Sequence, residues 1–172
     1  MRKTILLFTT MALALLLTAG MAWAAEGPPT VTSTVPTDGA INVDPTAKIK
    51  AKFSEPMKEG SINTTTFYLL KGNFTSANPP NCTTPPVSPS TTPVPVTCPA
   101  AITATVNYNE DTNTAKLIPS AALDFSTAYT AVVEGTGDGD MRAVKDRGGT
   151  AMATDKIFHF TTASAPLPPP IP

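Results

Sequence analysis

The side chain in this sequence best suited to proton transfer is its single histidine, His159. Hydrolytic catalysis by such a residue needs a nucleophile beside it and an acid that orients it. Serines and aspartates are present, but no phrase of the nucleophile-elbow type places a serine for attack. His159 alternates with Phe158 and Phe160 and therefore faces away from both. We predict a surface-facing strand histidine and no enzyme activity.

A second group of chemically capable side chains lies in the glycine- and aspartate-rich stretch 135–154. Asp138, Asp140 and Asp146 could offer carboxylate oxygens to Ca²⁺, a hard ion that prefers oxygen ligands. The stretch lacks the glutamate that closes an EF-hand loop at its twelfth position. The sequence therefore favours an ordinary solvated turn without a cofactor, and calcium binding is the alternative.

The two cysteines, Cys82 and Cys98, bracket a proline- and threonine-rich segment. No histidine lies near them, which argues against a metal or redox pair. In an oxidising compartment such a pair closes a disulfide. Closing a loop of this length contributes about 3 kcal/mol by loop-closure entropy. We predict that this disulfide ties the base of a long insertion at residues 71–100.

The first residues have the pattern of a secretory signal peptide. The basic pair Arg2-Lys3 precedes a mostly apolar run at 5–17, and a small-x-small site ends at Ala24. A transmembrane anchor is the alternative, but threonines interrupt the run and a cleavage-like site follows it. We predict a signal peptide at 1–24 and an exported protein, either extracellular, at the cell surface or periplasmic. No second apolar run is long enough to span a membrane after signal cleavage.

Charge excludes some partners. The sequence holds 12 basic and 13 acidic residues, and two of the basic ones, Arg2 and Lys3, fall in the predicted signal peptide. The remainder carries a net charge of −3, with its charges scattered and no basic run. Nucleic acid is therefore not an expected partner.

The element that organises the rest of the chain is the alternating segment Ala47–Phe53. Apolar residues at 47, 49, 51 and 53 alternate with Lys48, Lys50 and Lys52. This period of two is typical of a strand with one buried and one wet face, in an antiparallel sheet. The phrase Ser-Glu-Pro-Met ends the strand, because Pro56 cannot donate to a sheet ladder.

Other short segments with turn signals between them also have strand character. They lie at 28–36, 67–70, 101–108, 114–119, 130–134 and 156–162, with an apolar pair at 41 and 43. Leu123, a turn and then Tyr129 at the head of a strand are typical of a tyrosine corner. No amphipathic helix of useful length is present. We predict an antiparallel β-sandwich of seven or eight strands at 25–162, followed by a proline-rich tail at 163–172.

Four phrases, in this order and spacing, resemble the bacterial Ig-like domain of the S-layer-protein (SbsA) type. They are Val35–Val43, Ile49–Met57, Leu123–Tyr129 and Phe158–Thr162. The sequence departs from that family at 71–100, where the usual connection is much shorter. The resemblance implies an Ig-like sandwich in exported, cell-surface or S-layer-associated proteins, without enzyme activity of its own.

The functional expectation is a non-catalytic module that serves cell-envelope structure or adhesion. Its expected partners are other envelope or surface proteins, or glycans. The alternative is an extracellular module whose carbohydrate or calcium binding uses the loop 135–154.

Overall fold

The alternating segment around Ile49 forms strand β3 (Ile49–Phe53), as predicted. Ile49, Ala51 and Phe53 are buried, whereas Lys50 and Lys52 are exposed. The structure is a computed structural model that describes residues 27–75, 100–137 and 142–167. The strand pairs with antiparallel neighbours on both sides, so its lysine face is the outer face of a sheet.

Seven further strands and one short 3₁₀ helix complete the described residues. They are β1 (Val31–Val35), β2 (Ala40–Val43), η1 (Glu59–Ser61), β4 (Phe67–Lys71), β5 (Ala104–Asn109), β6 (Thr114–Pro119), β7 (Ala128–Val133) and β8 (Lys156–Thr162). The strand segments predicted at 101–108 and 114–119 form β5 and β6, which pair directly as an antiparallel hairpin.

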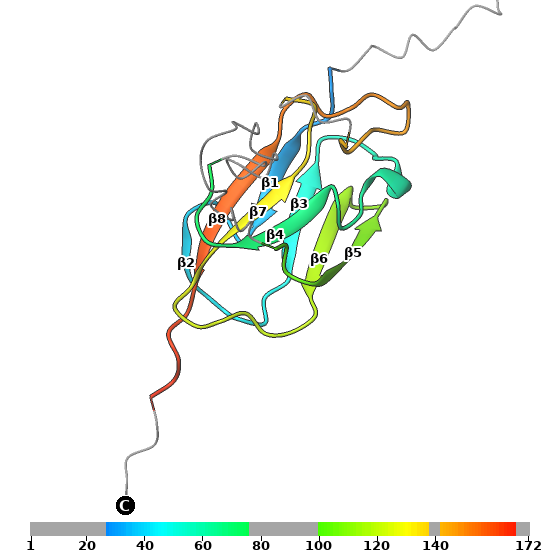
Figure 1. The fold of residues 1–172 in the computed structure, drawn as a ribbon. Helices are drawn as coiled ribbons and strands as arrows, with labels where there is room; N and C mark the ends of the chain where they lie inside the picture. The colour runs from blue at the N-terminus through cyan, green and yellow to red at the C-terminus, as the bar shows by residue number, and fades with distance from the viewer. Residues whose placement is uncertain (1–26, 76–99, 138–141, 168–172) are drawn as a thin grey trace, which may run out of the picture.

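The strands form two four-stranded sheets that pack face to face (Figure 1). The first sheet has the order β1-β3-β6-β5 and is antiparallel throughout. The second has the order β2-β8-β7-β4, and within it β2 runs parallel to β8. The first sheet corresponds to strands A, B, E and D of an immunoglobulin sandwich. In the second sheet, β4, β7 and β8 correspond to strands C, F and G, and β2 is an added edge strand. The predicted all-β sandwich is confirmed with eight strands, although the β2–β8 pair departs from the predicted antiparallel arrangement.

The core fills the space between the sheets. Its largest fully buried side chains include Phe53 from the first sheet and Phe67, Tyr129 and Phe158 from the second. Alternate residues along β5 and in the segment just before it pack against this core, namely Ile102, Ala104, Val106 and Tyr108.

The tyrosine corner is also confirmed. The backbone N–H of Asp124 donates a hydrogen bond to the Tyr129 hydroxyl at 2.9 Å. Leu123 is buried beside it. This contact fixes the connection that carries the chain from β6 in the first sheet to β7 in the second.

Strand β4 fits one of two expectations and not the other. The apolar phrase Phe67-Tyr68-Leu69-Leu70 suggests a strand buried on both sides or near the sandwich centre. Leu69 and Leu70 are indeed both buried, but β4 is the edge strand of its sheet and pairs only with β7 among the named strands. A run of apolar residues predicts burial, and a strand at the edge of this sheet can be buried on both faces.

The described part of the stretch 135–154 is more than a solvated turn. Val144 and Met152 are buried and belong to the core. A bridge between Met57 and Asp146 joins this stretch to the chain that leaves β3. Apolar side chains at separated positions, not an apolar run, attach the loop to the sandwich, which is why periodicity missed them.

Several predictions concern residues that the structure does not describe. The signal peptide at 1–24, both cysteines and most of the insertion at 71–100 lie outside the described ranges, so the disulfide stays a prediction. After β8 the described tail, 163–167, leads away from the sandwich, with Leu167 at 92% exposure. Within the described ranges, no helix is long and apolar enough to cross a membrane.

Candidate functional site

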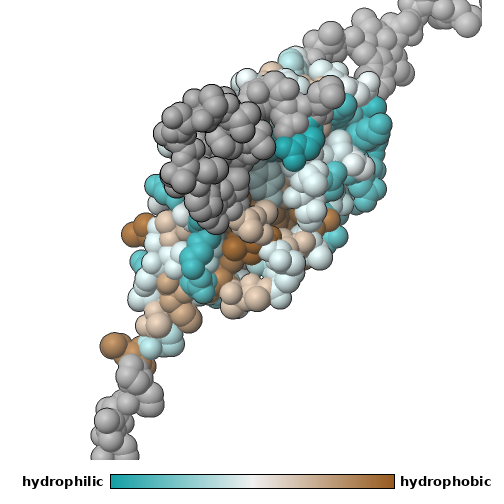
Figure 2. Space-filling view, viewed as in Figure 1, coloured by the Kyte–Doolittle hydropathy of each residue, from teal (hydrophilic) through white to brown (hydrophobic). Residues whose placement is uncertain are grey.

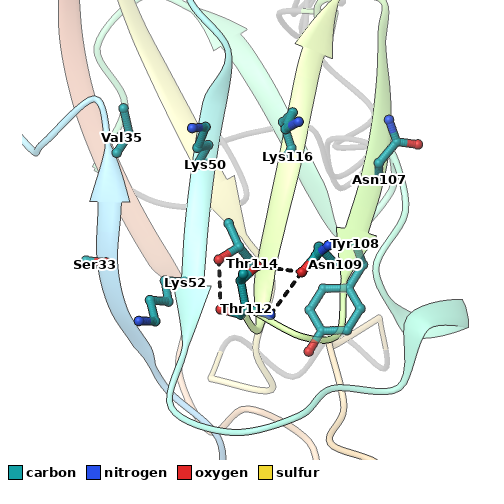
Figure 3. A pocket seen from close by; sticks show the side chains of 10 residues that line it. All are labelled: Ser33, Val35, Lys50, Lys52, Asn107, Tyr108, Asn109, Thr112, Thr114 and Lys116. Atoms are coloured by element: carbon teal, nitrogen blue, oxygen red, sulfur yellow. Dashed lines mark hydrogen bonds between the residues drawn. The ribbon is translucent and has the colours of Figure 1, made fainter.

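The candidate site is the outer face of the first sheet, where side chains from four strands form two parallel rows. Register pairs Val35 with Lys50, Lys50 with Lys116, and Lys116 with Asn107. Figure 3 shows these side chains aligned across the four strands. The first row therefore brings two lysines together at its centre.

The second row lies two residues further along the strands. Register pairs Ser33 with Lys52, Lys52 with Thr114, and Thr114 with Asn109. Together the two rows line a groove of about 650 Å³. We call it the lysine groove; its lining residues are Ser33, Val35, Lys50, Lys52, Asn107, Tyr108, Asn109, Thr112, Thr114 and Lys116.

Some of the lining side chains hold the fold and are not available to a ligand. Asn109 Oδ1 accepts hydrogen bonds from the backbone N–H and the hydroxyl of Thr112, at 2.9 and 2.7 Å. The Tyr108 hydroxyl accepts one from the backbone N–H of Met57 at 2.8 Å, and its ring packs edge-on against Phe53. These contacts build the β5–β6 turn and fix the floor of the groove.

The three lysines of the groove differ from these side chains. Among the residues that the structure describes, none of Lys50, Lys52 and Lys116 forms an ion pair. The amide of Asn107 and the hydroxyl of Ser33 likewise make no side-chain hydrogen bond within those ranges. The groove therefore offers three ammonium groups and two neutral polar groups to whatever enters it.

His159 faces outward on the other sheet, as predicted, but it is engaged on both ring nitrogens. Nδ1 lies 3.2 Å from a carboxylate oxygen of Asp38, and Nε2 lies 2.7 Å from the backbone carbonyl oxygen of Phe74. The backbone N–H of His159 also donates to Asp38, at 2.8 Å, and this bond lowers the pKa of Asp38 below its ordinary value of 3.8. His159 thus joins β8 to the β1–β2 turn and to the start of the insertion.

The predicted calcium ligands are only partly described. Asp146 Oδ1 accepts a hydrogen bond from the backbone N–H of Thr150 at 2.7 Å, which closes a local turn. Asp138 and Asp140 lie outside the described residues. Within the described ranges no three acidic, cysteine or histidine side chains group as metal ligands. Calcium binding by this loop stays an untested alternative.

One buried polar pair was missed by sequence reasoning. Glu134, at 2% exposure, follows the apolar run of β7 and accepts a hydrogen bond from the Tyr68 hydroxyl at 2.6 Å. Burial, followed by this bond to Glu134, raises the pKa of Tyr68. The signal available in the sequence was position: Glu134 directly extends a strand that is buried on both faces.

Comparison with known proteins gives one family and several similar structures. Residues 25–162 match the family described as bacterial Ig-like domain. A crystal structure of the S-layer protein SbsC is 19% identical, with a TM-score of 0.46, covering 83% of this chain. This chain spans only 14% of the length of that structure.

A second similar structure is of comparable size. PcoC, a methionine-rich copper resistance protein from Escherichia coli, is 16% identical, with a TM-score of 0.50. The match covers 79% of this chain and 99% of PcoC. At this identity the likeness concerns the fold. No curated protein sequence matches this chain.

Proposed function

This chain belongs to the bacterial Ig-like domain family, and we propose that it acts as a non-catalytic, exported module that serves cell-envelope structure or adhesion. Its partners in this proposal are other envelope or surface proteins, or glycans. The predicted signal peptide at 1–24 supports export, and the family supports a role in presenting a rigid surface.

The observation that carries the proposal is the lysine groove. It occupies the outer face of a sheet whose inner face is fully used by the core, since Ile49, Ala51 and Leu117 are all buried there. Its lysines contribute nothing visible to folding within the described residues. A stiff, exposed and chemically distinct face on a closed sandwich is suited to binding by contact.

The role of His159 supports the non-catalytic part of the proposal. Its two ring nitrogens face a carboxylate and a backbone carbonyl, and the side chain keeps 30% exposure. Such a residue ties three segments together and has no nucleophile among its hydrogen-bond partners in the described ranges. The hydrogen bonds of the His159 ring therefore favour a structural role for this residue.

Cell fractionation tests export. The full chain with a C-terminal epitope tag is expressed in a bacterium, and the tagged product is followed by immunoblot and N-terminal sequencing. We expect it outside the cytoplasm with Ala25 as its first residue, and a variant that lacks residues 2–24 should stay inside. A full-length product in the cytoplasm would contradict the proposal.

A substrate screen tests the absence of catalysis. The purified chain and a His159→Ala variant are compared on generic esterase and glycosidase substrates. We expect neither to turn over substrate above a buffer blank. Turnover by the parent chain that is lost in the His159→Ala variant would show an enzyme.

A further inference from the structure

The lysine groove has a positive charge that the usual structural reasons do not explain. Lysines on exposed edge strands protect a sheet against pairing with other chains. β3 and β6, however, are the two inner strands of their sheet, and β1 and β5 cover both of their edges. Lys50, Lys52 and Lys116 therefore do not act as edge protection.

Their spacing adds to the charge. Lys50 and Lys116 are directly opposite across β3 and β6, where Cβ atoms stand about 5 Å apart and like charges are mildly destabilising. Lys52 follows Lys50 on the same face, about 7 Å further along the strand. The backbone positions of the three lysines are thus spaced at intervals comparable to the length of one sugar unit.

The neighbouring groups define the rest of the ligand. Asn107 stands next to Lys116 in the first row, and Ser33 stands next to Lys52 in the second. The amide beside Lys116 and the hydroxyl beside Lys52 suit a ligand that carries hydroxyls near its anionic groups. Val35, at 53% exposure, is the one strongly exposed large apolar side chain in the lining.

We propose that the lysine groove binds a linear polysaccharide that bears carboxylates, such as a polyuronate. Lys50, Lys52 and Lys116 neutralise its carboxylates, and Asn107 and Ser33 hydrogen-bond its hydroxyls. This inference deepens the proposed function, because it names the envelope partner that the exposed face would hold.

Two other anionic partners fit less well. An acidic peptide usually adds apolar anchor side chains, and the groove offers only Val35 for them. Single-stranded nucleic acid stacks its bases on exposed aromatic rings. The one aromatic residue in the lining, Tyr108, is half-buried and packed against Phe53.

Affinity measurement with defined polymers tests the proposal. Isothermal titration calorimetry of the full chain uses polygalacturonate, neutral dextran and polyglutamate at equal mass concentration. We expect binding to polygalacturonate alone. Affinity should fall about tenfold or more when salt rises from about 0.05 to 0.5 M, because the interacting charges are exposed and therefore screened.

A groove variant locates the site. The combined change Lys50→Gln, Lys52→Gln and Lys116→Gln should weaken polygalacturonate binding about tenfold or more, since it removes three exposed ion pairs. The matched control changes Lys58, Lys145 and Lys156 to Gln, which gives the same net charge away from the groove. It should bind within about twofold of the parent chain. Thermal melting of both variants verifies that they fold.

A third variant separates sugar from bare charge. Asn107→Ala keeps all three lysines and should lower the affinity for polygalacturonate severalfold, because a hydroxyl partner is lost. Equal binding of polyglutamate would overturn the proposal in favour of an acidic protein partner. Absent polygalacturonate binding, or equal loss in the control, would overturn it too. None of these results bears on export, which fractionation tests separately.

Discussion

The outer faces of the two sheets differ in how far their side chains are exposed. In the first sheet β3 alternates strictly between buried and exposed residues, and its outer face ends in lysines. In the second sheet β7 is buried almost throughout, with Thr130 and Val132 at 0% exposure although they face away from the core. The molecule therefore has one open face and one covered face.

The start of the insertion contributes to that cover. The backbone N–H of Phe74 donates to the Thr130 hydroxyl oxygen at 3.0 Å, and that hydroxyl donates to the Gly72 carbonyl at 2.8 Å. His159 then contacts the Phe74 carbonyl oxygen from β8. The covered sheet anchors a segment of the chain, whereas the three lysines on the open sheet form no ion pair within the described residues.

Exposed hydrophobic residues are the second feature of the surface. On the side shown in Figure 2, most of them lie in the lower half of the view, among polar residues. The large hydrophobic side chains that are strongly exposed in the described ranges, Val35, Ile41, Phe125 and Leu167, are scattered along the chain. Scattered apolar residues are ordinary on a soluble surface. The charged groove is consequently the more informative feature.

The largest expected effect on stability comes from a substitution on the covered outer face of the second sheet. Leu70 is 3% exposed and lies outside the main core, on the outer side of β4. Leu70→Ala should lower the free energy of unfolding by about 2–5 kcal/mol, because it leaves a cavity. Urea unfolding measures it. A loss below about 0.5 kcal/mol, as expected of an open surface, would remove the distinction between the two sheets.

The next prediction loosens the connection between the sheets. Tyr129→Phe removes the acceptor for the Asp124 backbone N–H while keeping the buried ring. We expect a loss of about 1 kcal/mol in the free energy of unfolding, the usual net worth of one hydrogen bond. Tyr108→Phe, which removes the acceptor for the backbone N–H of Met57 in the segment after β3, is a matched comparison. No loss for Tyr129→Phe would show that the corner does not fix the crossing.

A third prediction concerns pH and the tether at His159. The folded-state pKa of Asp38 lies below its ordinary value of 3.8. The ionised carboxylate therefore stabilises the fold above about pH 3.8, and this contribution is lost as the pH falls through the folded-state pKa. Asp38→Asn should therefore melt at a lower temperature than the parent chain at pH 6. The difference should shrink as pH drops below about 3.8. A pH-independent difference in melting temperature would contradict this explanation.

The smallest expected effect on stability comes from substitutions on the open outer face of the first sheet. The combined change of Lys50, Lys52 and Lys116 to Gln should alter the free energy of unfolding by no more than about 0.5 kcal/mol. The sign should be slightly stabilising, since it relieves the like-charge pair across β3 and β6. A loss above about 1 kcal/mol in urea unfolding would mean that these lysines support the fold.

Local patterns were enough to predict most of this architecture. The alternation at 47–53 predicted both the strand and its wet face, and the outward direction of His159 followed from its phenylalanine neighbours. The tyrosine corner was predictable because all of its parts lie within a few residues. Each of these features depends on residues close together in the sequence.

What depended on pairing between distant segments was not predictable. The parallel pairing of β2 with β8, the edge position of β4 and the crossing of Phe74 over β7 all need the assembled sheets. The lysine groove is similar: Lys50 and Lys52 were visible as a stripe, but only the register brings Lys116 beside them. Sequence alone therefore indicated a wet strand and not a site.

Acetylation footprinting tests whether the lysines of the open face are free to meet a partner. The full chain is treated with limiting amine-reactive reagent, with and without polygalacturonate, and the modified lysines are quantified by mass spectrometry. We expect rapid modification of Lys50, Lys52 and Lys116 in the free protein. The polymer should protect these three lysines, while Lys58, Lys145 and Lys156 react unchanged. Slow modification of the three groove lysines in the free protein, or equal protection of all six, would contradict this expectation.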